Sequence, residues 1–259
     1  MNKGIYKSTD KFNKNTYRVS IYSNNKHLSI GTFDTVEKAE MCRTEAEIIL
    51  NDRNLSVEDF DNFNVISYEK FIVLSNLRDN GIYFRTPIYL KSNYFLYCFS
   101  PSITFKFDKD DLFFYSNHKI MKRGNHLFIF DYGMQINLFE RYNIPSYSVC
   151  GKDYIFKNHD IYDFRYSNIE IINPYFGVSK EEKNKKTVYT ARIHINGYTK
   201  IGEYDSELYA AIAYNKACDI ISAKTKVKYT QNYPNISPKE YADIYSKIKI
   251  SDKIINIQK

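Results

Sequence analysis

Two stretches of the chain alternate between apolar and polar residues with a period of two. The first stretch covers residues 16–22 and returns over 27–33, and the second covers 189–195 and returns over 198–204. Such alternation predicts β-strands with one buried face. Asn196-Gly197 joins the second pair, and this dipeptide favours a two-residue hairpin turn because both positions take positive φ.

A helix is expected directly after each strand pair. Asp34 and Asp205 are good N-cap residues, and the apolar residues that follow recur at helical spacing. The two apolar stripes are Ala39, Cys42, Ala46, Ile49 and Leu50 in the first copy and Ala210, Ala213, Ala217, Ile220 and Ile221 in the second. Because Ile30 matches Ile201 and Asp34 matches Asp205 at the same offset of 171 residues, the chain contains an internal repeat.

The region between the two copies is rich in apolar and aromatic residues. Glycine and proline divide it into short segments, which is typical of a β-rich fold. The strands expected here are Phe71-Ile72-Val73-Leu74, Tyr94 to Phe99, Leu112-Phe113-Phe114-Tyr115 and Leu127-Phe128-Ile129-Phe130. Near the end of the chain, Ser237-Pro238-Lys239-Glu240 predicts the start of a helix that runs to about Ile250.

The chain of 259 residues is basic, and its charge is unevenly distributed. Lys and Arg number 37 against 30 Asp and Glu, a formal net charge of +7. Residues 1–59 are balanced, with nine of each sign, whereas residues 172–259 hold fifteen basic and nine acidic residues. A polyanion is therefore expected to dock first on the C-terminal third.

Several classes of protein are disfavoured by the composition. Four cysteines in a chain of this length do not make a disulfide scaffold, and neither they nor the five histidines have the spacing of a zinc site. We therefore expect no metal and no cofactor. No apolar run is long enough for a membrane helix, and the first residues lack the apolar core of a signal peptide. An intracellular protein without a membrane partner is expected.

Both copies of the repeat resemble the apetala-two/ethylene-response-factor DNA-binding domain. The resemblance covers roughly residues 3–51 and 174–224, and it rests on Tyr17-Arg18-Val19-Ser20-Ile21 with Ile30-Gly31-Thr32-Phe33-Asp34 and on Tyr189-Thr190-Ala191-Arg192-Ile193 with Ile201-Gly202-Glu203-Tyr204-Asp205. The family implies a three-stranded antiparallel sheet on one helix, with the outer face of the sheet on DNA.

Strand alternation divides the expected sheet residues between the two faces. Val19, Ile21 and Ile30 should face the first helix, and Ala191, Ile193 and Ile201 the second. The residues expected on the outer faces, and hence on nucleic acid, are Arg18, Ser20, Tyr22, His27 and Ser29 in the first copy and Thr190, Arg192, His194, Tyr198 and Lys200 in the second. Lys180, Lys183, Lys185 and Lys186 are expected in a basic loop between the first two strands of the second copy.

Residues 157–169 are similar to the final part of an HNH homing-endonuclease domain, a ββα fold that cleaves DNA with a metal ion. Asn158, Asp160, Asp163, Arg165 and Asn168 fit its pattern in register. Asn158, Asp163, Arg165 and Asn168 are expected to hold the fold together through charge-assisted hydrogen bonds. The resemblance places Ile155 and Phe156 where the metal-binding Asp and the general-base His belong, and neither side chain can take a proton or bind a hard cation.

The sequence therefore predicts an α+β protein, with two small units of a three-stranded antiparallel sheet and a helix flanking a β-rich, HNH-like (ββα) middle domain. The expected segments are 1–59, 60–100, 101–173, 174–230 and 231–259. The function expected is non-catalytic binding of double-stranded DNA, mainly through phosphates. Two alternatives remain: a structural component of a ribonucleoprotein or protein assembly, and an active nuclease with relocated ligands such as His159, Asp160 or Glu140. The oligomeric state is not predicted.

Overall fold

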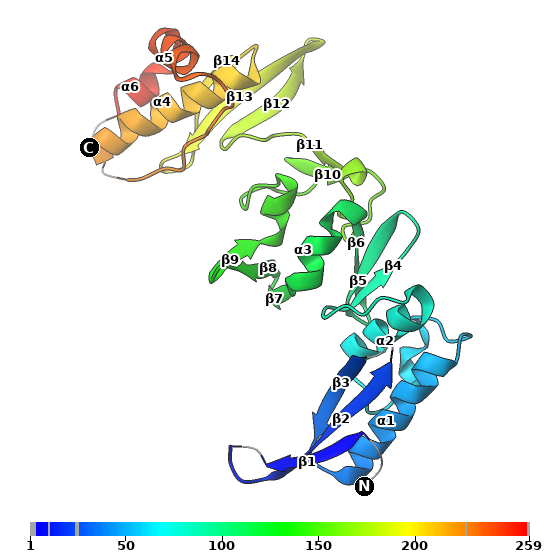
Figure 1. Cartoon of the computed structure of the whole chain (residues 1–259). Coiled ribbons are helices and arrows are strands. Elements are labelled where there is room, and N and C mark those ends of the chain that lie inside the picture. The colour runs from blue at the N-terminus through cyan, green and yellow to red at the C-terminus, as the bar shows by residue number, and fades with distance from the viewer. Residues whose placement is uncertain (1–3, 10, 24–25, 226, 258–259) are drawn as a thin grey trace. The chain divides into compact units, whose positions relative to one another are not determined.

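The computed structural model of the chain describes residues 4–9, 11–23, 26–225 and 227–257. It is an α+β structure built from several small antiparallel sheets and helices (Figure 1). The chain divides into two compact units, and each is described by itself. The first unit comprises Met1–Leu138 with Asp160–Asn168, and the second comprises Phe139–His159 with Ile169–Lys259. The segment 101–173, expected as one domain, contributes to both units.

The first unit begins with the sheet and helix that the N-terminal alternation predicts. Strands β1 (Ile5–Thr9), β2 (Asn15–Ser23) and β3 (Lys26–Phe33) form an antiparallel sheet in the order β1-β2-β3. Helix α1 (Val36–Asn51) packs along one face of this sheet (Figure 1). The residues expected toward the helix are buried, and Val19 is fully inaccessible.

Helix α1 starts one residue later than predicted. Its N-cap is Thr35, whose side chain accepts a hydrogen bond from the backbone N–H of Lys38 at 3.3 Å. Asp34 instead forms an ion pair with the Lys38 ammonium at 3.0 Å. The second copy shows the same shift, because α4 (Glu207–Thr225) begins after Ser206 and not after Asp205. Two adjacent capping residues precede each helix, and the sequence does not decide between them.

Helix α1 also fixes the chain that follows it. The carboxylate of Glu45 is buried and accepts hydrogen bonds from the backbone N–H groups of Asn64, Val65 and Ile66, the shortest being 2.7 Å to Ile66. A buried carboxylate is stable only when it is paired or hydrogen-bonded. Glu45 therefore holds residues 64–66 against the helix and sets the entry to the next element.

Two of the strands expected in the middle of the chain are helical, so those predictions were wrong. Phe71-Ile72-Val73-Leu74 lies in helix α2 (Tyr68–Asn80), and Leu112-Phe113-Phe114-Tyr115 lies in helix α3 (Leu112–Asn117). Helix α2 is buried around most of its circumference from Phe71 to Leu77, so it shows no amphipathic period. The other two expected strands, 94–99 and 127–130, are confirmed.

These confirmed strands are the central members of two further sheets of the first unit. The β4-β5-β6 sheet consists of Ile88–Leu90, Tyr94–Ser100 and Ile103–Asp108, and the β7-β8-β9 sheet of Met121–Arg123, His126–Asp131 and Met134–Asn137. Short 3-10 turns lie at Asp59–Asn62, Lys109–Asp111 and Leu138–Tyr142.

The second unit contains a small two-stranded sheet. Strands β10 (Tyr154–Phe156) and β11 (Ile169–Ile171) pair antiparallel, with Phe156 opposite Ile169. The next element along the chain is strand β12, so β11 is not followed by the helix that completes a ββα unit. This part of the expected HNH-like architecture is limited to its two strands.

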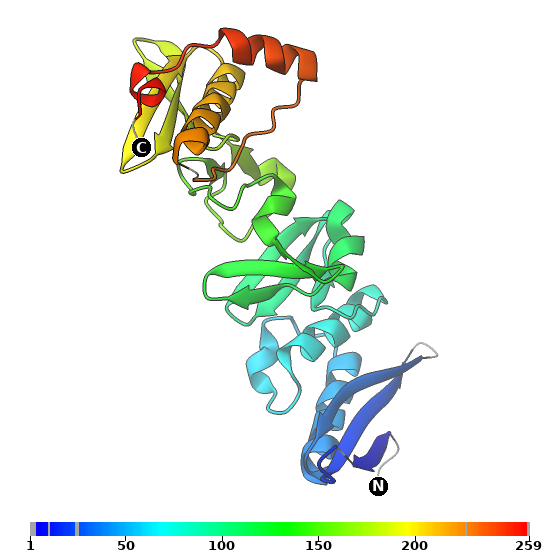
Figure 2. The ribbon, with the colours of Figure 1, turned by 90° about the vertical axis from the view of Figure 1, so that its left-hand side faces the viewer.

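The second copy of the repeat has the same plan as the first. Strands β12 (Val178–Lys183), β13 (Lys186–His194) and β14 (Tyr198–Tyr204) form the sheet. Helix α4, orange in Figure 2, lies along one face of it. Ala191, Ile193 and Ile201 are buried toward this helix, as alternation predicts.

The C-terminal region packs onto helix α4. Helix α5 (Pro238–Lys247) begins as predicted, since the Ser237 side chain accepts from the N–H of Glu240, but it ends before Ile250. Helix α6 (Asp252–Ile255) follows. The buried amide of Asn215 both donates to and accepts from the backbone of Asn232, at 2.8 and 2.7 Å, and the Asn232 amide does the same to Phe176. These paired bonds connect α4 to the start of the second sheet.

Candidate nucleic-acid interface

The outer face of the second sheet carries the cations and rings that the sequence places there. Arg192, His194, Tyr198 and Lys200 are exposed on the face opposite α4. Arg192 lies opposite Lys200 across β13 and β14, and His194 lies opposite Tyr198. Cations and hydroxyl groups on an open sheet are the groups that contact phosphates.

Two expectations for this face were wrong. Thr190 is fully buried in the central strand between Ser179 and Glu203, so it is not available to a ligand. Lys180 was expected in the loop after the first strand, but it lies within β12 and pairs with Tyr189, in the set of residues that faces α4. Its charge lies near the partly buried carboxyl of Glu207. Burial raises the pKa of this carboxyl and the Lys180 charge lowers it, and the net change is an increase.

The basic loop expected between the first two strands is much shorter than predicted. Strand β12 extends to Lys183 and β13 starts at Lys186, so only Asn184 and Lys185 form the turn. Both have positive φ, +51° and +63°, which is the geometry of a tight hairpin. Lys183 and Lys186 therefore belong to the sheet, as opposed partners across the two strands.

Three cations of this sheet are paired with two carboxylates that were not among the residues expected on its outer face. Glu181 lies 3.1 Å from the Arg192 guanidinium and 3.2 Å from the Lys183 ammonium. Glu203 lies 2.7 Å from Lys200 and also contacts Lys183. The Lys183 and Lys200 ammonium groups lower the pKa of Glu203 to about 2, so this carboxylate is charged at any physiological pH.

The outer face of the first sheet forms a shallow hollow of about 490 Å³. Its lining residues are Tyr6, Ser8, Arg18, Ser20, His27 and Ser29, none of which is acidic. Arg18, Tyr22 and His27 are exposed, as expected, whereas Ser20 is buried at 8% exposure in the floor. A bulge between Val19 and Ser20 accompanies this burial.

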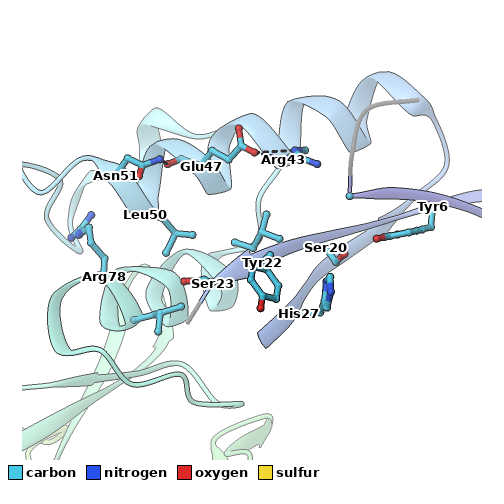
Figure 3. A pocket seen from close by; sticks show the side chains of 13 residues that line it. Tyr6, Ser20, Tyr22, Ser23, His27, Arg43, Glu47, Leu50, Asn51 and Arg78 are labelled. Carbon is cyan, nitrogen blue, oxygen red and sulfur yellow. Dashed lines mark hydrogen bonds and ion pairs between the residues drawn. The ribbon is translucent and has the colours of Figure 1, made fainter. Parts of the chain in front are cut away.

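A second hollow, of about 540 Å³, adjoins the first at Tyr6, Ser20 and His27. Figure 3 shows the helix side of this hollow, where Arg43 and Glu47 point toward each other. They form an ion pair of 2.8 Å between Arg43 Nη2 and Glu47 Oε1.

A histidine and a tyrosine form a pair at the same place in both sheets. Tyr22 and His27 have ring centroids 5.1 Å apart, and His194 and Tyr198 have centroids 5.3 Å apart. The two residue types exchange strands between the copies. Each pair lies beside the hairpin that joins the second and third strands, and exposed rings of this kind can stack on bases.

The HNH-like segment is held by a buried acid in the first unit. Arg165 donates to both carboxylate oxygens of Asp163, at 2.8 and 2.6 Å, and Asn168 donates to the Asp163 carbonyl at 2.8 Å. Asp163 is fully buried and raises the pKa of Arg165 further above its usual range. Lys106 exchanges backbone bonds with Tyr162 and Phe164. The structure thus brings together three of the four expected residues, and the fourth, Asn158, is exposed in the second unit.

The two positions at which the HNH resemblance expects a metal ligand and a base are both apolar in strand β10. Phe156 is buried against Tyr154, and Ile155 is half-buried opposite Glu170. Among the described residues, no group of three His, Cys, Asp or Glu side chains is placed to hold a metal ion. His159 is exposed at a turn with φ +62°, and Asp160 forms an ion pair with Lys106 at 2.7 Å.

Comparison with models of protein families, with curated proteins and with solved structures finds no match for this chain. In the part of the chain that the structure describes, no helix is both long enough and apolar enough to cross a membrane. Function must therefore be inferred from the surfaces described above.

Proposed function

We propose that this chain is a non-catalytic protein that binds double-stranded DNA through the outer faces of its two repeated sheets. The observation that carries the proposal is the repeat itself: two sheets, each covered by a helix on one face, have open faces with cations and an exposed histidine–tyrosine pair. The resemblance of both copies to apetala-two/ethylene-response-factor domains supports duplex DNA as the partner.

Contacts to phosphates are expected to provide most of the affinity. Arg18, Arg192 and Lys200 are exposed cations on these faces, and serine and tyrosine hydroxyl groups surround Arg18. Such groups position a protein on the DNA backbone, whereas base reading needs several side chains that reach base edges. Binding should therefore depend more on salt than on sequence.

The test is fluorescence anisotropy of a labelled DNA duplex with the full chain at low and at physiological salt. We expect the affinity to fall by at least about tenfold between the two salt concentrations. A triple variant, Arg18→Ala with Arg192→Ala and Lys200→Ala, should weaken binding further. Arg53→Ala with Lys152→Ala and Lys239→Ala removes the same charge from exposed positions outside the sheets and should bind like the native chain.

Two results would reject the proposal. One is the absence of duplex binding at low salt, and the other is an affinity that does not change with salt. An RNA duplex, titrated in parallel, decides between the two nucleic acids.

The second candidate function is a structural role in a ribonucleoprotein or protein assembly. The ion-paired face of the second sheet favours it, because paired charges suit a protein surface better than a polyphosphate. Co-purification of the chain with large particles, together with no affinity for free duplex, would support this role.

A further inference from the structure

Among the equivalent positions at which the outer faces of the two sheets differ, two carry a carboxylate in the second copy only. The strand registers match Ser8 with Glu181, since Ser8 pairs with Thr16 and Glu181 with Val188. Thr32 pairs with Arg18 in the first copy, and Glu203 pairs with Thr190 in the second. The registers therefore also match Thr32 with Glu203. Hydroxyl side chains of the first copy thus stand where the second copy has carboxylates.

These two carboxylates change what the second face offers to an anion. Glu181 contacts Arg192 and Lys183, and Glu203 contacts Lys183 and Lys200. A phosphate that approaches these cations meets a fixed negative charge within the same ion-pair network. Like charges placed side by side across an interface are unfavourable, so phosphate binding here requires the cations to leave their partners.

The described part of the first face has no such competition. Within the described ranges, Arg18 is exposed and forms no ion pair with an acidic residue, and none of the described residues that line the hollow around it carries a carboxylate. Ser8, Ser20 and Ser29 line the same hollow with hydroxyl groups that can donate to a phosphate oxygen. One free guanidinium with several hydroxyl donors suits a phosphodiester better than the more cationic but compensated second face.

We infer, on the basis of the proposed function, that the first sheet makes the principal phosphate contact with duplex DNA, while Glu181 and Glu203 restrain the second sheet. These two acidic side chains thus lower the affinity of the chain for DNA, although they are not expected to contact the DNA themselves. The excess of basic residues in the C-terminal third therefore does not identify the surface that makes the principal phosphate contact.

A reciprocal exchange of the matched residues tests this inference with a labelled DNA duplex at low salt. Glu181→Ser with Glu203→Thr should tighten binding about three- to tenfold, because the released Lys and Arg side chains become available to phosphates. Ser8→Glu with Thr32→Glu should weaken binding by a similar factor. Ser8 and Thr32 are exposed, and exposed ion pairs contribute little to stability, so both variants should fold.

The control is Glu58→Ser with Glu182→Ser, which raises the net charge by the same amount at two exposed positions outside the network. It should tighten binding by less than about twofold. An exchange variant that binds no more tightly than this control would overturn the restraint by Glu181 and Glu203. If the Ser8 and Thr32 variant does not fold, as judged by circular dichroism, Arg18→Ala replaces it and should weaken binding more than Arg192→Ala does.

The outcomes separate this inference from the proposed function. If the native chain binds no duplex, the proposed function fails first. If it binds and Arg192→Ala weakens binding more than Arg18→Ala does, the proposed function stands and the leading role of the first sheet is rejected.

Discussion

At the scale of single residues, Arg78 shows how a charged side chain can be structural. Its side chain is only 2% exposed, and it donates to the carbonyl groups of Ile49, Asp52 and Leu55 while it pairs with Asp79. Carbonyl groups at a helix C-terminus have no hydrogen-bond donor within the helix. Arg78 acts as the donor at the end of α1. It is therefore no part of the nucleic-acid surface, although it borders the second hollow.

Replacing Arg78 should destabilise the first unit. Arg78→Ala removes the donor to the carbonyl groups of Ile49, Asp52 and Leu55 and the ion-pair partner of Asp79, which should cost about 3 kcal/mol in the free energy of unfolding. Arg78→Lys should recover only part of this loss, because an ammonium group lacks the planar fork. Urea denaturation measures the change. Arg53→Ala, at an exposed site, should stay within about 0.5 kcal/mol of the native chain, and an equal loss in both would contradict the assignment.

The four cysteines should react very differently with an alkylating reagent. Burial raises the pKa of the Cys42 and Cys218 thiols to about 12 and that of Cys98 to about 11, whereas Cys150 is exposed. A pKa above the ordinary value keeps these three thiols protonated and unreactive at pH 8. Mass spectrometry after iodoacetamide treatment should find one modified cysteine in the native chain and four in urea. Two or more modified in the native chain would contradict the packing.

At the scale of elements, the sequence predicts the two repeated sheets well because each has one buried and one exposed face. Alternation then places Val19 and Ile193 inward and Arg192 outward. The same reasoning fails for helix α2. Because this helix is buried on most sides, Phe71 to Leu74 are all apolar and show no helical period. A short apolar run is equally compatible with a buried strand.

The candidate site was predictable only in part, for a similar reason. Alternation identifies Arg192 and Lys200 as outward residues, but it does not show that Glu181 and Glu203 contact them. Those contacts depend on the strand register and on how far β12 extends, and the tight turn at Asn184-Lys185 sets both. The turn is not evident from residue type, because lysine is uncommon at positive φ.

Glycine at the start of the second sheet is required by a close approach between elements. Gly177 has φ +71°, and a Cβ there would lie 2.2 Å from the Tyr214 ring and 2.6 Å from the Arg192 carbonyl. Gly177→Ala should therefore destabilise the second unit by about 2–4 kcal/mol in urea denaturation. The matched control is Gly151→Ala, with φ +84° and no atom nearby, which should lose only about 1–2 kcal/mol. Equal losses of stability in the two variants would show that the positive φ alone, and not the close approach of Tyr214 and Arg192, acts at Gly177.

At the scale of the whole molecule, the distribution of formal charge does not predict the distribution of available charge. Residues 172–259 hold six more basic than acidic residues, yet the exposed cations of the second sheet are largely paired with Glu181 and Glu203. Residues 1–59 are balanced, and none of the described residues that line the hollow around Arg18 is acidic. Surface register, and not the count of charges, decides where an anion is favoured.

The last prediction concerns catalysis by the whole chain. The HNH resemblance places Ile155 and Phe156 of strand β10 where that family has a metal ligand and a general base, and neither side chain can accept a proton. Hydrolysis of DNA by that family needs both groups to activate water. We therefore expect supercoiled plasmid to remain intact with the purified chain in millimolar Mg²⁺ or Mn²⁺, as measured by agarose gel electrophoresis. An active HNH nuclease on the same plasmid is the positive control.

Nicking alone would not overturn this prediction, because contaminating nucleases also need divalent metal ions. The deciding variants are His159→Ala and Glu140→Ala, since both residues are exposed in the second unit and neither belongs to the Asp163 cluster. Metal-dependent nicking that persists through purification and disappears in either variant would assign catalysis to relocated ligands. Nicking that survives in both variants would exclude His159 and Glu140 as the relocated ligands.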